Sequence, residues 1–344
     1  MGDVRAAQSA LIDLAEAAYD LEVDEAAWLP QVMEAGLPVL NHGLGVFGGV
    51  YTRPLDGGAL TLHQLHVAAG GEDFIARQAR VAGDCPPEVQ QACTRPGICT
   101  TLSEAAGQKY ASAVESWTQH HQGSKDALGL SAVDPDGQGA MIAVPLAERT
   151  KLTGALRERW QMVGAHLATG YRLRRRLQHA QNIAVESQLP LDADALLDPK
   201  QFAIKEATRE AEGADARQAL REAAVLADRA RGAMRKTRPE EALRIWTSLT
   251  GGRWSLVDWF DSDDRRFVLA LRNPPDLKDP RGLTDRESQV ATFAGLGDSG
   301  TLIAYRLGIS KARVSVLLKR AMRKLGVSTH TELTEKIGAF VRTR

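Results

Sequence analysis

Residues Leu283-Thr284-Asp285-Arg286-Glu287 begin the part of the chain that decides its fold. Thr284, with Glu287 three positions later, forms a Ser/Thr-x-x-Glu capping box, in which each side chain hydrogen-bonds the backbone amide of the other at the start of a helix. We expect this helix to end near Leu296, since Gly297 adopts at little cost the left-handed backbone that terminates helices. The pattern therefore predicts a helix directly after Thr284.

Three more helices are expected behind the first. Ser299 caps a second one, and Ser310 caps a third over Lys311–Leu325. Another capping box, Thr329-x-x-Glu332, starts the fourth. Two short helices joined by a tight turn that contains glycine are typical of the helix-turn-helix, whose second helix enters the major groove of DNA. We therefore predict an all-α, four-helix DNA-binding domain over 281–344.

The predicted third helix is strongly basic. From 283 to 344 the chain has 11 Lys+Arg against 5 Asp+Glu, a formal charge of +6, whereas the whole chain of 344 residues is neutral. A run of charge is most often a solvated helix face, but this run falls on the helix that would enter the groove. We therefore predict that five cations contact DNA phosphates: Lys311, Arg313, Arg320, Arg323 and Lys324.

Apolar residues give the same helix an inner side. Val314, Leu318, Ala321 and Leu325 stand at i, i+4, i+7 and i+11. This is the spacing of a helix side that packs against a core. We therefore expect these residues to point inward and the cations to point toward solvent.

The segment resembles the LuxR-type (GerE-type) helix-turn-helix family of bacterial transcription factors, in register and without a gap. The matching elements are Leu283-Thr284, Arg286-Glu287, Gly297, Ile303-Ala304, Leu307-Gly308-Ile309-Ser310, Val314 and Arg323-Lys324-Leu325-Gly326-Val327. The resemblance implies a DNA-binding regulator whose fourth helix pairs with its copy in a homodimer. The seam of that pair would consist of Leu333, Ile337 and Phe340.

The resemblance also places the base contacts at Ser315, Val316 and Lys319. Lys319 could donate to guanine acceptors, Val316 could pack on a thymine methyl group, and Ser315 could bond either kind of base. The chain departs from the family at Leu302, where an acid is usual, so we expect the second helix to start less firmly. In the third helix Arg313, Ser315 and Leu317 stand where Thr, Lys and His are common, and the operator sequence stays open.

The region 1–180 is predicted to be an α+β domain, an antiparallel sheet with flanking helices. Alternating or apolar runs separated by turn residues indicate two hairpins, and apolar positions at helical spacing indicate three helices, with helical or irregular sequence over 72–122. The hairpins pair 44–51 with 60–67 and 127–133 with 140–146, and the helices cover 4–19, 24–36 and 152–177. The order of elements resembles a GAF-like sensor domain, which could leave a pocket for a small effector.

The middle of the chain is predicted to be a helical linker over 181–240 and a helix with a β-hairpin over 241–273. Ala216, Leu220, Ala223, Ala227, Ala230 and Met234 follow a coiled-coil spacing. This seam could dimerise two chains or pack within one. Trp246, Trp254 and Trp259 are expected to hold the hairpin subdomain together rather than to stack on a ligand. The Pro-rich run 273–280 is the clearest domain boundary.

Several chemical alternatives receive little support. Cys85, Cys93 and Cys99 are odd in number and fit no common zinc spacing, so free thiols are expected. His63 and His66 would lie on opposite faces of a strand, and we predict no metal site. The glycines of 43–48 spell G-x-G-x-x-G but fall in a predicted strand, whereas a dinucleotide site needs them between a strand and a helix. No cofactor is expected.

Taken together, these patterns predict a multidomain transcription regulator in which the N-terminal sensor controls the C-terminal domain. Its partners would be double-stranded DNA, a second copy of the chain, an effector and the transcription machinery. Alternatively, a protein partner binds the N-terminal domain without any small molecule. No catalytic cluster stands out, so we expect no enzyme. The chain shows no signal peptide and no apolar run of membrane-spanning length, which predicts a cytoplasmic protein.

Overall fold

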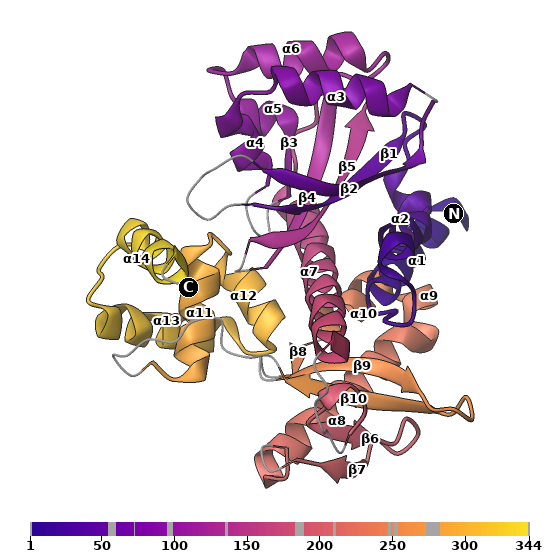
Figure 1. The fold of residues 1–344 in the computed structure, drawn as a ribbon, viewed down its shortest axis with the longest axis vertical. Helices are drawn as coiled ribbons and strands as arrows, with labels where there is room; N and C mark the ends of the chain where they lie inside the picture. The colour runs from indigo at the N-terminus through magenta and orange to yellow at the C-terminus, as the bar shows by residue number, and fades with distance from the viewer. Residues whose placement is uncertain are drawn as a thin grey trace.

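The structure is a computed structural model of the chain. It describes residues 2–53, 60–71, 73–94, 99–134, 137–182, 189–208, 211–246, 249–250, 254–272 and 283–342. Three units are visible in Figure 1: a first sheet with its helices at the top, a second sheet at the bottom, and a helical C-terminal unit on the left. Residues 54–58, which join the predicted strands 44–51 and 60–67, and the predicted linker at 273–280 lie outside the described residues.

The first unit is a five-stranded antiparallel sheet in the order β2-β1-β5-β4-β3, with helices on both faces. Its strands are β1 (Val46–Thr52), β2 (Thr61–Ala69), β3 (Cys99–Thr101), β4 (Asp126–Val133) and β5 (Gln138–Leu146). Its helices are α1 (Gly2–Ala18), α2 (Glu25–Leu40), α3 (Phe74–Asp84), α4 (Pro87–Cys93), α5 (Leu102–Ala106), α6 (Ala111–His120) and α7 (Gly154–Asn182). Both predicted hairpins and all three predicted helices are present, whereas the short edge strand β3 was not predicted.

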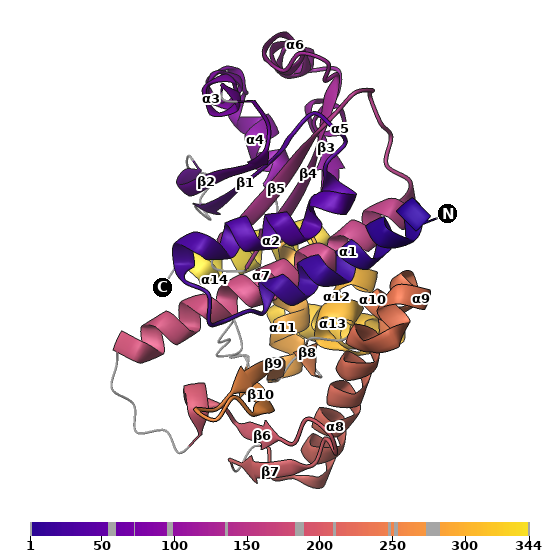
Figure 2. The same ribbon diagram turned by 90° about the vertical axis from the view of Figure 1, so that its right-hand side faces the viewer.

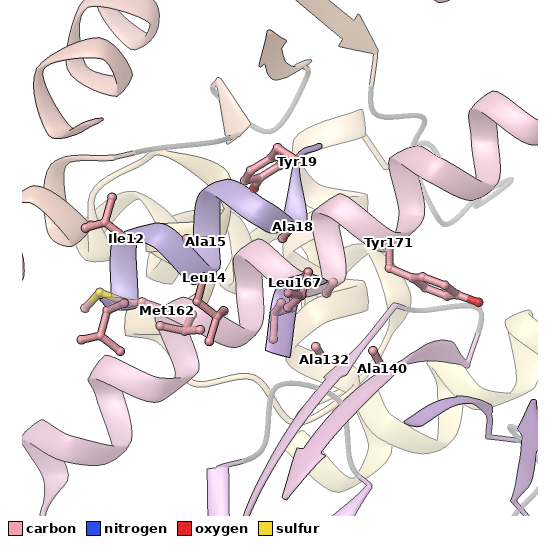
Figure 3. Packing of buried hydrophobic residues seen from close by; sticks show 14 of the residues in the cluster. Ile12, Leu14, Ala15, Ala18, Tyr19, Ala132, Ala140, Met162, Leu167 and Tyr171 are labelled. Carbon is pink, nitrogen blue, oxygen red and sulfur yellow. The ribbon is translucent and has the colours of Figure 1, made fainter. Parts of the chain in front are cut away.

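Two separate apolar layers cover this sheet. On one face Phe47 of β1 packs with Phe74 and Trp117 from α3 and α6, so large rings fill the space between the sheet and these helices. On the other face α7 crosses β4 and β5 and α2 covers β1 and β2, while α1 packs on both helices; Figure 3 shows Leu14 of α1 beside Leu167 of α7. The layer with α1 and α7 is the larger one, and it extends beyond the first unit.

The second unit contains more strands than the sequence predicted. Its elements are η1 (Pro190–Asp192), β6 (Ala195–Leu197), β7 (Ile204–Ala207), α8 (Ala214–Arg229), the π-helical turn η2 (Ala230–Met234), α9 (Arg235–Thr237), α10 (Pro239–Ile245), β8 (Leu249–Thr250), β9 (Trp254–Phe260) and β10 (Arg266–Arg272). The predicted β9–β10 hairpin is correct, but it belongs to a five-stranded sheet in the order β7-β6-β10-β9-β8. The prediction of 181–240 as a purely helical linker is wrong, because strands as short as β6 and β7 show no readable alternation.

The two sheets share one topology. In each, the first strand lies between the second and the fifth, and all pairs are antiparallel. The predicted coiled-coil seam spans α8 and η2, and it lies on this second sheet and on the core shared with α1. All six of its residues are buried, which confirms packing within one chain: Ala216, Leu220, Ala223, Ala227, Ala230 and Met234.

The C-terminal unit consists of α11 (Asp285–Gly295), α12 (Gly300–Leu307), α13 (Lys311–Leu325) and α14 (His330–Arg342). The capping box of Thr284 and Glu287 is formed, and Thr329 and Glu332 exchange the corresponding bonds before α14. The unit has its own apolar core, built around Val290, Phe293, Ile303, Val314, Leu325 and Ile337. It is therefore a separate helical domain, and the capping residues in the sequence mark where its helices begin.

Candidate nucleic-acid interface

Helix α13 has well-defined ends. The Ser310 hydroxyl accepts a hydrogen bond from the Arg313 amide at 3.2 Å, which satisfies one of the free donors of the first turn. Gly308 before the helix and Gly326 behind it have φ of 61° and 66°, values that favour glycine. Since α12 ends at the first of these glycines, the helix-turn-helix geometry follows directly from caps that are readable in the sequence.

The buried side of α13 differs from the prediction at one position. Val314, Ala321 and Leu325 are buried as expected, but Leu317 (4 % exposed) takes the place predicted for Leu318, which is only half-buried. Both leucines fit a helical apolar stripe, and the packing of α13 on α11 and α12 decides which one faces inward. The inner stripe therefore runs at i, i+3, i+7 and i+11.

The outer side of α13 is exposed with the rest of the chain in place. Figure 1 shows the helix at the edge of the molecule, away from both sheets. The three predicted base contacts, Ser315, Val316 and Lys319, are all exposed; Val316 keeps 43 % of its surface. Of the five predicted phosphate contacts, four are exposed as well: Lys311, Arg313, Arg320 and Arg323. One helix face thus offers cations around a short polar and apolar centre, an arrangement that suits a groove lined by phosphates.

Lys324 has a different environment. Its ammonium lies 2.6 Å from the carboxylate of Glu287, whose side chain is almost fully buried at the start of α11. Burial raises the pKa of Glu287, but the hydrogen bonds from Lys324 and Thr284 outweigh it and leave the pKa below its ordinary value. Lys324 therefore ties α13 to α11, a structural role that the sequence analysis did not assign to it.

The predicted dimer seam is not available as predicted. Leu333 and Ile337 are 0 % and 1 % exposed and belong to the core of the helical unit. A Cβ atom at Gly295 of α11 would lie only 2.6 Å from the Ile337 side chain, so the two helices are in close contact. The side chain of Phe340 lies outside the described residues. Leu333 and Ile337 thus stabilise the domain itself, because α14 needs an apolar side to pack on α11.

Helix α12 faces the rest of the chain instead of solvent. It packs against α7 and approaches β8. Its Tyr305 hydroxyl lies 3.0 Å and 3.2 Å from the carbonyl oxygens of Leu243 and Trp246, at the end of α10, and is also hydrogen-bonded to His166 of α7. These contacts join the C-terminal unit to both other units at a single tyrosine.

His166 lies at the centre of this junction and is fully buried. Its Nδ1 is 3.0 Å from the Tyr19 hydroxyl of α1, its Nε2 bonds Tyr305, and its ring packs at 4.6 Å from that of Trp246. Burial, aided by the charge of Arg231, lowers the pKa of His166 to about 3. The neutral ring with a proton on Nε2 satisfies the network: Tyr19 donates to Nδ1, Nε2 donates to Tyr305, and Tyr305 donates to the carbonyls.

Leu302 explains a departure from the family pattern. It is buried one helical turn before Tyr305, yet it lies outside the apolar core of the C-terminal unit. The Ser299 hydroxyl still accepts from the Leu302 amide at 3.2 Å, so half of the cap remains. Leu302 and Tyr305 share one side of α12. An acid at position 302 would therefore place a carboxylate in a buried position on the same side as Tyr305.

The remaining sequence candidates form no second site among the residues that the structure describes. Gly43 and Gly45 precede β1 and follow α2, the reverse of the order that a dinucleotide site needs, and only Gly48 of this motif lies in the strand. The three cysteines are free, and burial raises the pKa of Cys85 to about 11 and those of Cys93 and Cys99 to about 12. In the part of the chain that the structure describes, no cluster of His, Cys, Asp and Glu could hold a metal ion.

Comparison with known families agrees with this geometry. Residues 281–337 match the family described as bacterial regulatory proteins of the luxR family. The chain therefore contains a LuxR-type helix-turn-helix domain, which implies a DNA-binding transcription regulator; such regulators are generally not enzymes. No curated protein matches the chain. No helix among the described residues has the length and apolar character needed to cross a membrane.

Proposed function

We propose that this regulator reads DNA through the exposed side of α13. Ser315, Val316 and Lys319 would contact base edges in the major groove, and Lys311, Arg313, Arg320 and Arg323 would contact phosphates. The observation that carries this proposal is the exposed cationic side of α13, in a chain whose other two units leave it open. The match of 281–337 to the luxR family and the helices of the described residues 285–342 support the same use of α13.

Two matched variants test these roles. On an operator selected from genomic fragments, Lys319→Ala should cost about 1–3 kcal/mol and relax the base preference. Arg320→Ala should weaken binding to every sequence and reduce the slope of log K against log salt by about one unit. Equal losses on all sequences for both variants would refute the division of roles. Glu115→Gln, on the exposed side of α6, serves as the control.

We further propose that the two N-terminal units control DNA binding through the docked helix α12. Since α13 stays exposed in the docked arrangement, docking would not block the groove helix. It would instead fix how two C-terminal units are oriented in a homodimer, and thus which operator spacing they fit. The support is the junction around Tyr305, which contacts α7 and the end of α10 at once.

Control of this kind requires two arrangements that a ligand or partner distinguishes, with couplings of typically about 1–3 kcal/mol. Tyr305→Phe keeps the ring and removes the hydroxyl bonds, so it should shift the balance toward the undocked arrangement. Affinity for operators of varied half-site spacing is the measurement. If affinity does not vary with half-site spacing, in the unchanged protein and in Tyr305→Phe alike, control by orientation is ruled out. The GAF-like identity of the first unit is retained as a proposal, supported by its antiparallel sheet with helices on both faces.

A further inference from the structure

A cavity of about 480 Å³ lies between the first and the second unit. Its walls come from the connection between α1 and α2 (21–25), from the C-terminal part of α7, from Leu191 and from β9. Figure 2 shows this part of the molecule, where the end of α7 and the α1–α2 connection lie above β9. The volume falls within the range of sites that bind small molecules, about 300–1,000 Å³.

The buried wall of the cavity carries an incompletely satisfied cation. Arg174 of α7 is only 7 % exposed, and its Nη1 donates to the Asp20 carbonyl oxygen at 2.7 Å. Its Nε is buried and has no hydrogen-bond partner among the described residues. A buried donor without an acceptor costs free energy, and a guanidinium bonds a carboxylate better than any neutral acceptor. Since this Nε is closed to solvent, a ligand would meet the rest of the Arg174 guanidinium, which lines the cavity and would hold an anionic group there.

The rim of the cavity has the opposite charge. Glu22, Asp24 and Glu25 line it and are exposed. Asp24 and Glu25, together with Asp20, lie close enough to Arg174 to oppose the lowering of its pKa by burial. An ammonium group would be stabilised at this rim, a short distance from a carboxylate held by Arg174.

An apolar surface completes the site. Leu21, Leu177 and Leu191 line the cavity with Trp259, whose ring packs on Phe267 at 5.8 Å and is only partly buried. Such a surface would bind an apolar body between the two charged ends. We infer that the cavity binds a small zwitterion of the α-amino-acid class, with its carboxylate on Arg174, its ammonium at the acidic rim and its apolar side chain on Trp259.

The floor of the cavity leads to the junction at α12. Asp258 lines the cavity and pairs with Arg231 at 2.8 Å. The guanidinium of Arg231 lies 5.1 Å from the ring centroid of Trp246, and the Trp246 carbonyl accepts from Tyr305. A ligand that changes the Asp258–Arg231 pair thus acts two contacts away from α12. In this respect the inference deepens the proposed function and depends on it: the zwitterion would be the effector.

Binding by itself is tested on the purified full-length chain by calorimetry. The common L-amino acids are screened, and each one that binds is compared with its amine alone and its carboxylic acid alone, as for phenylalanine, phenethylamine and 3-phenylpropanoate. We expect the zwitterion to bind and each half-ligand to bind at least about 10-fold more weakly, since each has lost one charge-assisted contact. No binding by any amino acid, or equal binding by the half-ligands, would overturn the inference.

Variants locate the site. Arg174→Gln and Glu22→Gln should each weaken binding by about 10-fold or more, and Glu115→Gln should leave it unchanged. Glu22 is exposed, so Glu22→Gln tests the site even if Arg174→Gln does not fold. Unchanged binding in Glu22→Gln, or in a folded Arg174→Gln, would place the ligand elsewhere. Operator affinity with and without the ligand then separates the two proposals: binding without an effect on DNA would leave the site standing and refute its role as the effector site.

Discussion

The two helices of the helix-turn-helix have opposite surroundings. The outer side of α13 is polar, cationic and exposed, whereas α12 carries the buried Leu302 and packs Tyr305 against the core of the other two units. Both helices have the same caps and pack on the same core. The comparison shows that the two helices differ in how far they are covered, and the sequence marks this at Leu302, a buried apolar residue in a place where the family usually has an acid.

The largest expected effect separates docking from folding. Leu302→Glu restores the usual acid and completes a capping box with Ser299, which should stabilise α12 itself by about 1 kcal/mol. In the docked arrangement, however, the same carboxylate would be buried where Leu302 now lies, and removing a carboxylate from water costs several kcal/mol. We therefore expect the C-terminal unit to undock and stay folded. Faster hydrogen exchange in α7 and α12 would report the undocking. Near-native protection in α11 would show that the C-terminal unit stays folded.

The control for this change is Thr334→Glu, which adds an acid to the exposed side of α14. It should alter neither the exchange of α7 nor that of α12. Equal protection of α7 in Leu302→Glu and in the unchanged protein would show that α12 does not depend on an apolar contact.

A second variant pair examines the inner side of α13. Leu317→Ala should destabilise the C-terminal unit by about 2–4 kcal/mol, because it leaves a cavity in a packed core. Leu318→Ala should cost clearly less, since Leu318 is only half-buried. Thermal and denaturant unfolding of the full chain, followed by exchange in α13, gives both values. A larger loss of stability in Leu318→Ala than in Leu317→Ala would support the inward position of Leu318 that the sequence predicted.

Acid should weaken the junction at α12. The pKa of His166 is lowered to about 3 in the docked arrangement, so undocking returns it toward 6.5. Stability from docking is therefore complete above about pH 6.5 and falls as the pH drops below it, by at most about 1.4 kcal/mol per unit. The groups that face the ring are the hydroxyls of Tyr19 and Tyr305, the guanidinium of Arg231 and the ring of Trp246.

Docking measured by exchange between pH 7 and pH 5 tests this expectation. His166→Gln keeps a polar side chain and cannot titrate, so its docking should lose most of the pH dependence. Glu16, whose pKa is raised by burial beside Arg231, titrates nearby in both proteins and cancels in the difference. An identical slope in the two proteins would assign the effect to other groups.

The last expected effect concerns Lys324. Lys324→Met removes the ion pair with the buried carboxylate of Glu287, which should cost about 1–3 kcal/mol of stability. Non-specific DNA binding should change less than it does in Arg320→Ala, because the ammonium is already held by Glu287. A DNA loss equal to that of Arg320→Ala, with unchanged stability, would instead support the phosphate contact predicted from the sequence.

The elements that the sequence predicted correctly are those held by interactions between residues close together in the chain. Thr284, Ser310 and Gly326 define helix ends through bonds within a few residues, and the caps predicted there are confirmed. The hairpins of the first sheet were equally readable, since their strands are long and their turns local. Strands β6 and β7 were missed because three or four residues carry no period. β6 is held by pairing with β10, more than sixty positions away, and β7 is held by pairing with β6.

The sequence by itself determined the C-terminal helices, the basic side of α13 and the family to which that domain is similar, because caps and charge act locally. Only the tertiary structure decided that Leu317 faces inward, that Leu333 and Ile337 stabilise the domain core, and that Tyr305 joins three units. The physical reason is that burial depends on the partner surface. An apolar residue on a helix predicts that its side chain will be buried. Which surface buries it depends on distant parts of the chain.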